Sequence, residues 1–354
     1  MNHIKQISEK LADYGLDAML ITSESGERYA IGFLGEGMLL ITKNGAHYST
    51  DGRYIEAAEE QITGVELECI GAGKTHLSMA KAYIEAHKLH NVGFESGAVT
   101  VDDHRRYSQA LPCILTPAQS LLDDLRASKD EEELDAMRRA QAITDEAFKA
   151  ILDFIKPGMT EREIAARLVY EMMRRGAQKV SFDPIVAAGA NGSMPHAVPG
   201  DQKVECGMFI TMDFGCKVDG YCSDMTRTVA LGQPTEEMEQ VYAAVLEAQK
   251  AGINAARAGV QGKEVDAAGR RVIQEAGYGE YFTHGFGHSL GIDIHESPNA
   301  NAREERALPA GAVISAEPGI YMPGKFGVRI EDVLILREGG CEDITRSPKQ
   351  LIVL

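Results

Sequence analysis

The sequence predicts an α/β domain over residues 1–125, followed over residues 126–354 by an α+β domain that consists of two similar halves. The length of 354 residues exceeds the usual size of a single domain, so two domains are expected. Helical and strand-like patterns alternate in the first part of the chain, as they do in α/β domains. The second part contains one strand motif twice, and both copies carry a carboxylate at the same position.

The first domain is expected to begin with a helix over residues 3–14, because Ile4, Ile7 and Leu11 follow helical spacing. A strand over 17–22 comes next. A hairpin should then form from strands 37–42 and 47–50, and Asn44-Gly45 between them suits a type I′ turn. Further helices are predicted at 54–62, 76–88 and 101–110, with strands at 65–70 and 91–94. We find no catalytic constellation in this domain.

The domain boundary is predicted near residues 125–129. Ser128 and Glu131 have capping-box spacing and are expected to open a long helix. Thr160 and Glu163 have the same spacing and should cap the next helix. The charged faces of these helices are expected to be solvated surface.

An internal repeat dominates the second domain. The segments 207–215 and 311–319 align residue for residue, with glycine at both ends, a central isoleucine, a hydroxyl residue and a carboxylate. A second strand with another carboxylate follows each copy. Packing of the halves about a pseudo-twofold axis would bring these four acids together, namely Asp213, Asp224, Glu317 and Glu331.

Four ionised carboxylates at the centres of apolar strands would be too costly to bury without a compensating positive charge. Arg227 and Arg329 do not balance four acids, whereas two divalent cations would, with His288 as a nitrogen ligand. Oxygen-rich coordination suits Mn²⁺ or Co²⁺ better than structural Zn²⁺. Two such ions about 3.5 Å apart can share a hydroxide and polarise a carbonyl, so the pattern indicates metal-assisted hydrolysis.

Three histidines lie within twelve residues, at positions 284, 288 and 295. Intervening glycines disfavour a helix, so a turn followed by a short strand is expected. One histidine could face a metal and its neighbours a substrate. The alternative is that they are ordinary polar loop residues.

The net charge of −17 argues against nucleic acid or an anionic membrane as a partner, because an acidic surface repels both. The N-terminus lacks the continuous apolar core of a signal peptide, and no run approaches the roughly 20 apolar residues of a membrane-spanning helix. The six cysteines are scattered without a C-x-x-C pair and are interpreted as packed apolar residues. We therefore expect a cytoplasmic protein.

At these residues the sequence closely resembles the prolidase, aminopeptidase P and creatinase family, whose catalytic domain has the pita-bread fold. The resemblance covers essentially the whole chain. The C-terminal motifs are highly specific, and the weaker segments 29–33 and 50–54 match the small N-terminal domain of the prolidase branch. The resemblance thus implies a creatinase-type N-terminal domain and a pita-bread metallopeptidase domain.

The resemblance implies how two divalent ions would be held, with Mn²⁺ expected and Co²⁺ or Zn²⁺ as alternatives. Asp213 would chelate one ion, and His288 and Glu317 the other. Asp224 and Glu331 would bridge them. All five family positions for metal ligands are filled in this chain.

The resemblance also implies which residues act on the substrate. Glu317 would be the general base for a bridging water and would deliver the proton to the leaving nitrogen. His196 and His295 match histidines that flank the scissile carbonyl, hold the substrate and stabilise the oxyanion. His284 matches a further active-site histidine, and Arg329 matches an arginine that orients the site from outside the ligand set.

The implied reaction is cleavage of an X-Pro bond near a free N-terminus. The compact length and short N-terminal domain favour an X-Pro dipeptidase, with an X-Pro aminopeptidase acting on longer peptides as the alternative. A dipeptidase needs a cation for the free proline carboxylate, commonly an arginine after the third histidine. Here Asn299 directly follows Pro298, so Arg303 is the expected carboxylate clamp.

Two other functions occur among proteins that the sequence resembles. Relatives that have lost their ligands serve as metal-free binding modules, and creatinase-like enzymes hydrolyse C–N bonds without metal. The complete ligand set disfavours both. A homodimer is expected from the resemblance alone.

Overall fold

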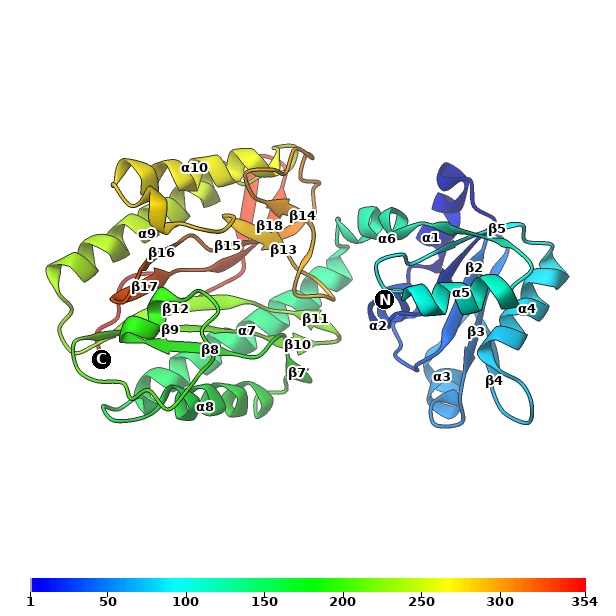
Figure 1. Ribbon diagram of the computed structural model, residues 1–354, viewed down its shortest axis with the longest axis horizontal. Helices are drawn as coiled ribbons and strands as arrows, with labels where there is room; N and C mark the ends of the chain where they lie inside the picture. The colour runs from blue at the N-terminus through cyan, green and yellow to red at the C-terminus, as the bar shows by residue number, and fades with distance from the viewer. Residues whose placement is uncertain (1) are drawn as a thin grey trace. The chain divides into compact units, whose positions relative to one another are not determined.

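The computed structural model describes residues 2–354, which form two compact units, residues 2–126 and 127–354 (Figure 1). We call them unit 1 and unit 2. Each has its own buried apolar core, as expected of separate domains. None of the described helices combines the length and the apolar composition needed to cross a bilayer.

Unit 1 is built on one six-stranded mixed sheet. Its strands are β1 (Ala18–Ile21), β2 (Met38–Thr42), β3 (Gly45–Thr50), β4 (Glu66–Cys69), β5 (Asn91–Phe94) and β6 (Ile114–Pro117), and its helices are α1 (Ile4–Lys10), α2 (Glu24–Ile31), α3 (Ile55–Gln61), α4 (His76–His87), α5 (Val101–Ala110) and α6 (Gln119–Arg126). The strand order is β4-β3-β2-β1-β5-β6. Strand side chains such as Leu40 and Val92 are fully buried against Ile84 of α4. The predicted elements are all present, whereas α2, β6 and α6 were not predicted.

The predicted hairpin is present, but its predicted turn is wrong. Thr42 pairs with Gly45, so the turn residues are Lys43 and Asn44. Neither has a positive φ, which a type I′ turn would require. The Thr42 hydroxyl closes the turn instead, because it accepts from the Asn44 N–H at 3.2 Å and donates to the Gly45 carbonyl at 2.9 Å.

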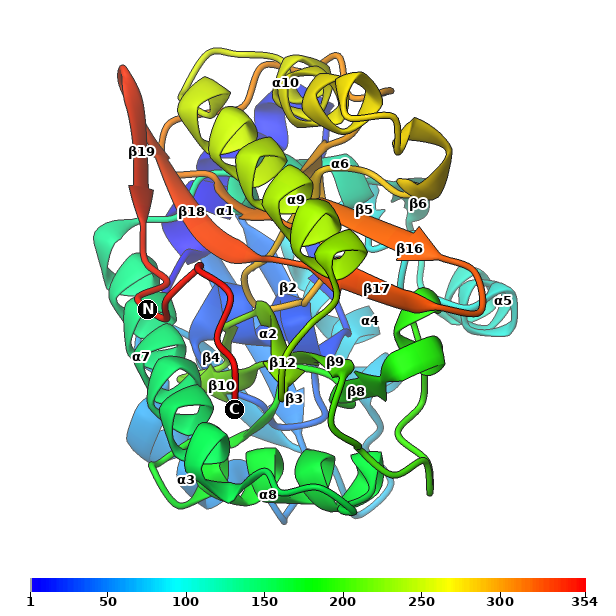
Figure 2. The same ribbon diagram turned by 90° about the vertical axis from the view of Figure 1, so that its left-hand side faces the viewer.

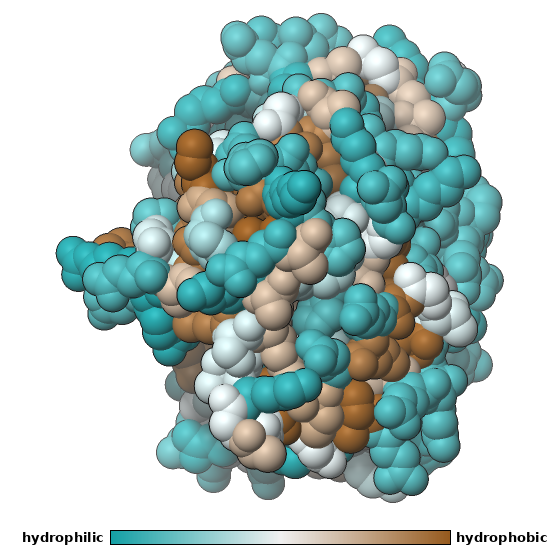
Figure 3. Space-filling model, turned by 90° about the vertical axis from the view of Figure 1, so that its right-hand side faces the viewer, coloured by the Kyte–Doolittle hydropathy of each residue, from teal (hydrophilic) through white to brown (hydrophobic). Residues whose placement is uncertain are grey.

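The face of the molecule in Figure 3 is mostly hydrophilic, with apolar side chains gathered in separate areas between polar ones. In the described part of unit 1, the large hydrophobic side chains that are well exposed are Val101 and Ile114. They belong to α5 and β6. The remaining large apolar side chains of the unit lie in its interior or are only partly exposed.

Unit 2 consists of two similar halves, each with a helix pair and a β-hairpin. The first half contains α7 (Glu131–Phe154), α8 (Glu161–Met173), β7 (Lys179–Val180), β8 (Ile185–Ala188), β9 (Met208–Phe214), β10 (Cys216–Val218), β11 (Tyr221–Cys222) and β12 (Met225–Leu231). The second contains α9 (Glu236–Ala255), α10 (Gly262–Glu275), β13 (Gly287–Ser289), β14 (Glu296–Ala300), β15 (Val313–Ala316), β16 (Gly319–Met322), β17 (Phe326–Arg329), β18 (Asp332–Arg337) and β19 (Gly340–Asp343). The predicted internal repeat is therefore confirmed.

The two helix pairs of unit 2 enclose its strands. Helices α7 and α8 lie on one side, α9 and α10 on the other, with the strands between them (Figures 1 and 2). The strands β12-β9-β8 form one sheet, and β14-β13-β15-β18-β19 form another. In both, the hairpin pair is flanked by a strand from earlier in the same half, so the halves match in topology as well as in sequence.

Three local predictions in unit 2 need correction. The capping box of α7 joins Asp130 and Glu133 and not Ser128 and Glu131, because the Ser128 hydroxyl donates to the carbonyl of Ala310. The box of α8 at Thr160 and Glu163 is confirmed. The charged faces of α7 and α8 are not solvated throughout, because some of their acidic side chains are buried. The buried acids are Glu133, Glu161 and Glu171.

The third correction concerns the four acids of the repeat, which were expected at strand centres. Asp213 is the penultimate residue of β9, while Asp224, Glu317 and Glu331 lie just outside the strands, at their ends. A strand end leaves the carboxylate free to turn toward a cavity. A strand centre would fix it against the neighbouring layer.

Candidate active site

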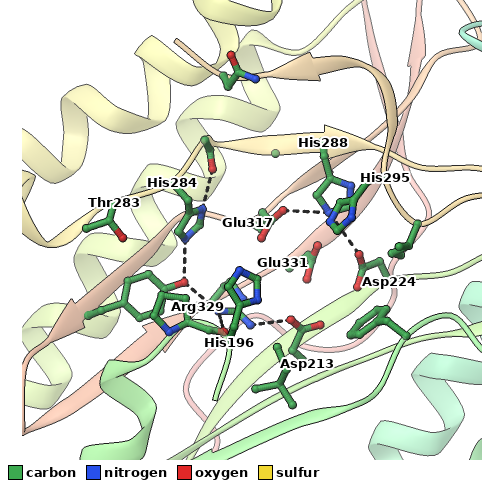
Figure 4. Close-up of a pocket in the computed structure, with 18 of the residues that line it drawn as sticks. His196, Asp213, Asp224, Thr283, His284, His288, His295, Glu317, Arg329 and Glu331 are labelled. Atoms are coloured by element: carbon green, nitrogen blue, oxygen red, sulfur yellow. Dashed lines mark hydrogen bonds and ion pairs between the residues drawn. The ribbon is translucent and has the colours of Figure 1, made fainter. Parts of the chain in front are cut away.

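A cavity of about 870 Å³ lies in unit 2, and all ten predicted site residues line it. All of them except Arg303 are labelled in Figure 4. Other lining residues include Phe182, Pro184, Ile185 and Ile294, which give part of the wall an apolar character. The ten predicted residues are His196, Asp213, Asp224, His284, His288, His295, Arg303, Glu317, Arg329 and Glu331.

The hairpins of the two halves bring the four acids together. In the first half, β9 pairs with β12 so that Asp213 lies opposite Thr226, close to Asp224. The two halves are joined at the same place, because the Glu331 N–H donates to the Thr226 carbonyl at 3.0 Å. The Thr226 hydroxyl in turn donates to Glu331 Oε2 at 2.7 Å. The convergence predicted from the repeat is thus present.

His288 enters this group of acids from β13. Its Nε2 lies 3.2 Å from Glu317 Oε1 and 3.6 Å from Asp224 Oδ2. Its Nδ1 lies 3.2 Å from the Ser289 carbonyl oxygen, which can only accept, so Nδ1 carries the proton and Nε2 is left as a ligand atom. Burial lowers the pKa of His288, which favours the neutral, ligating form.

The acids repel one another in a buried site. Burial raises the pKa of Asp224 well above its usual value, and Glu331 and Asp213 raise it further. Burial likewise raises the pKa of Glu331 and of Glu317. The only arginine that pairs directly with the group, among the residues that the structure describes, is Arg329, whose Nη2 donates to Asp213 Oδ2 at 2.6 Å.

The donor set fits divalent cations. Asp213 Oδ1 and Asp224 Oδ1 are buried and have no hydrogen-bond partner in the described part of the chain. Ligand atoms of Asp224, His288 and Glu331 all lie within 4.8 Å of one another. Carboxylate oxygens with one imidazole are ligands that Mn²⁺, Co²⁺ and Zn²⁺ accept.

The positive charge of Arg227 does not compensate the negative charges of the four acids. Its Nη2 lies 2.7 Å from Asp332 Oδ1, so its ion pair is with an acid outside the group of four. Arg329, by contrast, connects the acids to the substrate side. Its Nη1 donates to the Tyr321 hydroxyl at 2.9 Å, and that hydroxyl lies 2.8 Å from His284 Nε2.

The contacts of His284 define its protonation. Its Nδ1 lies 2.8 Å from the Gly285 carbonyl oxygen and therefore carries the proton. The Tyr321 hydroxyl, which accepts from Arg329, then donates to Nε2. Burial lowers the pKa of His284 and raises that of Tyr321 to about 12, so both groups are neutral. Sequence reasoning missed Tyr321, because a tyrosine in an apolar strand carries no spacing signal.

His295 and His196 face the cavity from two different segments. The His295 ring stands edge-to-face against His288 with centroids 4.5 Å apart, and burial lowers its pKa. His196 is exposed and comes from the segment between β8 and β9. The two imidazoles are thus available to a substrate from different walls.

Arg303 lies at the cavity wall with Asn299 and Asn301. Its backbone N–H donates to Asn301 Oδ1 at 2.9 Å, and its guanidinium has no acidic partner among the described residues. The other lining arginines are occupied, Arg270 by Asp266 and Arg329 by Asp213. Arg303 is therefore the lining cation whose charge is available to a ligand.

Residues 135–338 match metallopeptidase family M24, and residues 3–128 match the creatinase/prolidase N-terminal domain. The chain belongs to metallopeptidase family M24. It is 40% identical to an uncharacterized peptidase of Bacillus subtilis, over 99% of both chains. It is 34% identical to an Xaa-Pro dipeptidase of Pyrococcus horikoshii, over 99% of this chain and 98% of the relative.

Solved structures agree with this assignment. An Xaa-Pro dipeptidase from Bacillus anthracis has a TM-score of 0.96 and 39% identity, with 99% of both chains covered. An X-Pro aminopeptidase from Thermotoga maritima has a TM-score of 0.93 and 35% identity, with 100% of both covered. The predicted fold, a creatinase-type N-terminal domain followed by a pita-bread catalytic domain, is confirmed. As an M24 enzyme, the protein is a hydrolase that uses divalent metal ions.

Proposed function

We propose that this metallopeptidase is an X-Pro dipeptidase, with Asp213, Asp224, His288, Glu317 and Glu331 as the ligands of two divalent cations. The observation that carries the proposal is the placement of the five ligands, the histidines and a cation without an acidic partner around one cavity. Relatives named Xaa-Pro dipeptidase over nearly the whole chain support it.

Two divalent cations, when bound, would lower the pKa of a water molecule and polarise the scissile carbonyl. Glu317 would take a proton from the attacking water at its carboxylate and pass it to the departing proline nitrogen. The Ser315 hydroxyl donates to Glu317 Oε1 at 2.9 Å and accepts a hydrogen bond from the backbone N–H of His288 at 3.0 Å. It therefore fixes the Glu317 carboxylate relative to His288.

The other three histidines of the site, His196, His284 and His295, are proposed to act on the substrate and not on the metal. His295 and His196 donate to the carbonyl oxygen as negative charge develops on it. His284 lines the pocket, and its Nε2 accepts a hydrogen bond from the Tyr321 hydroxyl. Proline offers no amide N–H, so its ring is recognised by shape against the apolar part of the wall.

Arg303 is proposed to bind the free carboxylate of the proline, since its charge has no acidic partner among the described residues. The alternative is an X-Pro aminopeptidase, which acts on longer peptides and does not need this contact. The similarity to the Thermotoga maritima X-Pro aminopeptidase supports this alternative, so the experiment includes longer peptides.

The deciding experiment compares Ala-Pro with X-Pro tripeptides for the unmodified protein and for Arg303→Met. A dipeptidase cleaves Ala-Pro, and loss of Arg303 raises its KM about 10-fold, as for a lost charge-assisted hydrogen bond. The matched control is Arg306→Met, because Arg306 is nearby, about half exposed and already paired with Glu304. Rapid cleavage of tripeptides with inert dipeptides would establish the aminopeptidase instead.

Mn²⁺ is the proposed metal, because most ligand atoms are carboxylate oxygens. Metal analysis of protein purified without chelator, followed by activity with Mn²⁺, Co²⁺ and Zn²⁺, tests this choice. Two equivalents of Mn²⁺ and the highest turnover with it are expected. Less than one equivalent at saturating Mn²⁺ would favour a metal-free binding module.

A homodimer is also proposed, and it rests on the family resemblance. Light scattering during size-exclusion chromatography at micromolar concentration tests it. Twice the chain mass of 38.4 kDa is expected. The mass of a single chain would reject the dimer without affecting the proposed reaction.

A further inference from the structure

The segment that carries His196 connects β8 to β9, and its backbone decides where the imidazole lies. The His196 side chain is exposed and has no hydrogen bond to any described residue. A histidine that must meet a developing charge within hydrogen-bond distance needs a defined position. The groups that hold this segment in place should therefore affect catalysis through the position of His196.

One buried carboxylate binds both ends of the part of this segment that contains His196, residues 188–200. Glu161 is the first residue of α8, and only 1% of its surface is exposed. Its Oε1 accepts the Ala188 N–H at 2.8 Å and the Asn191 side-chain amide at 3.0 Å. Its Oε2 accepts the Gly200 N–H at 3.0 Å. Ala188 and Gly200 lie on either side of His196 in the chain.

Glu161 has no arginine or lysine partner among the described residues, so these three donors are what stabilises its charge. Its position in the first turn of a helix adds the favourable field of the helix N-terminus. Hydrogen bonds to an ionised carboxylate are stronger than those between neutral groups. Glu161 is thus a rigid anchor and not a solvated helix acid.

The opposite side of the segment lies against β17. A Cβ atom on Gly327 would collide with the Gly192 carbonyl oxygen, so the two backbones are in close contact. Arg329 Nη1 also donates to the Pro195 carbonyl at 3.3 Å. Figure 4 shows His196 beside Arg329 in the cavity. The segment is held between α8 on one side and β17 on the other.

We propose that Glu161 is a positioning residue that acts through His196, because its carboxylate fixes both ends of the segment that presents the imidazole to the substrate. This inference rests on the proposed role of His196. In Glu161→Gln, one oxygen is replaced by an NH₂ group that faces an N–H donor. One end of the segment then loses its acceptor, while the metal ligands keep all their contacts.

A double-mutant cycle tests the inference with the metal-loaded, full-length enzyme and Ala-Pro as substrate. Glu161→Gln is expected to lower kcat about 10- to 100-fold, as for a small misplacement of a catalytic group, with a smaller change in KM. In the His196→Ala background, the same substitution should lower kcat less than about 2-fold, because the group it positions is gone. Metal content should stay at the level of the unmodified protein.

The matched control is Glu163→Gln, which changes the same residue type in the same helical turn. Glu163 is exposed and caps the helix through Thr160, so its loss affects helix stability and not the His196 segment. Its kcat should remain near that of the unmodified enzyme. Equal losses from Glu161→Gln with and without His196, or an equal loss in Glu163→Gln, would overturn the inference.

Hydrogen exchange provides a readout that is independent of catalysis. The amides of Ala188 and Gly200 should exchange faster in Glu161→Gln, and unchanged protection would overturn the anchoring role. If Glu161→Gln does not fold, Asn191→Ala removes one of the three donors and should give a smaller kcat loss that again requires His196. If the unmodified protein cleaves no X-Pro peptide, the proposed function fails, whereas the exchange result still decides whether Glu161 anchors the segment.

Discussion

Replacing Arg227 with methionine should destabilise unit 2 strongly, because the guanidinium joins β12 to β18 and to the C-terminal segment. Arg227 is 1% exposed and pairs with Asp332 Oδ1 at 2.7 Å. It also donates to four carbonyl oxygens, those of Thr226, Glu331, Ser347 and Pro348. Methionine has similar length but no donor, so all five acceptors lose this partner.

The expected loss follows from the environment of Asp332. Breaking a buried ion pair by removing one partner costs about 3–5 kcal/mol, because the other charge stays buried. Asp332 is fully buried but keeps Lys349 and the Gln249 amide, so we expect the lower end, about 3 kcal/mol. For a unit of this size, that loss lowers Tm by about 6–12 °C.

Thermal unfolding followed by circular dichroism, at fixed pH and metal concentration, measures this shift. Arg162→Met is the control, because Arg162 pairs with Asp201 on the surface and such pairs contribute little. The double variant Arg227→Met/Asp332→Asn should lose less than the sum of the single variants. A shift for Arg227→Met no larger than that of the control would refute the reasoning.

Two further predictions concern the site, and a third concerns the ion pair of Arg306 with Glu304. His288→Ala should weaken metal binding more than about 100-fold, which is the upper end of the range for residues that only hydrogen-bond to a metal ligand. His295→Ala should keep the metals and lose about 100-fold or more in kcat. Equal loss of metal in titrations of both variants would contradict this division of roles. Removal of metal with a chelator should lower Tm, and Mn²⁺ at 100 times its Kd should restore about 2.7 kcal/mol, which calorimetry with and without Mn²⁺ would detect; an unchanged Tm would argue against a metal centre. The hydrogen bond from Arg306 lowers the pKa of Glu304 to about 2, so its contribution to stability is complete above the unfolded pKa near 4.5 and is lost as pH falls toward 2. Urea unfolding of Glu304→Gln and the unmodified protein should therefore differ more at pH 7 than at pH 3, and a constant difference would count against this assignment.

The convergence of the four acids could be predicted because the repeat makes their positions comparable. Asp213 and Glu317 occupy the same place in two aligned segments, which implies a shared partner. Their exact setting could not be predicted. Whether a carboxylate lies within a strand or at its end depends on where pairing stops, and that is decided by the neighbouring strand and not by the local sequence.

Contacts between distant segments account for the residues that sequence reasoning missed. Thr160 and Glu163 form a capping box that is visible from their spacing. Glu161 between them has no such signal, because its partners Ala188 and Gly200 lie 27 and 39 residues away. Tyr321 was missed for the same reason. A polar side chain in an otherwise ordinary helix or strand is assigned to the surface or the core unless its partners are known.

The topology of unit 2 explains why metal binding and substrate binding should separate in mutants. The sheet orders β12-β9-β8 and β18-β15-β13 make β8 and β13 equivalent strands, and both flank the hairpin that carries two acids. Only β13 supplies a histidine, His288, whereas β8 consists of Ile185, Val186, Ala187 and Ala188. His288, the proposed fifth ligand, thus breaks the symmetry of the repeat. His196 follows β8 and His295 follows β13, each on a segment of different length and conformation. Changes in the repeated hairpins should therefore alter metal affinity, while changes in these two segments should alter turnover with the metals retained.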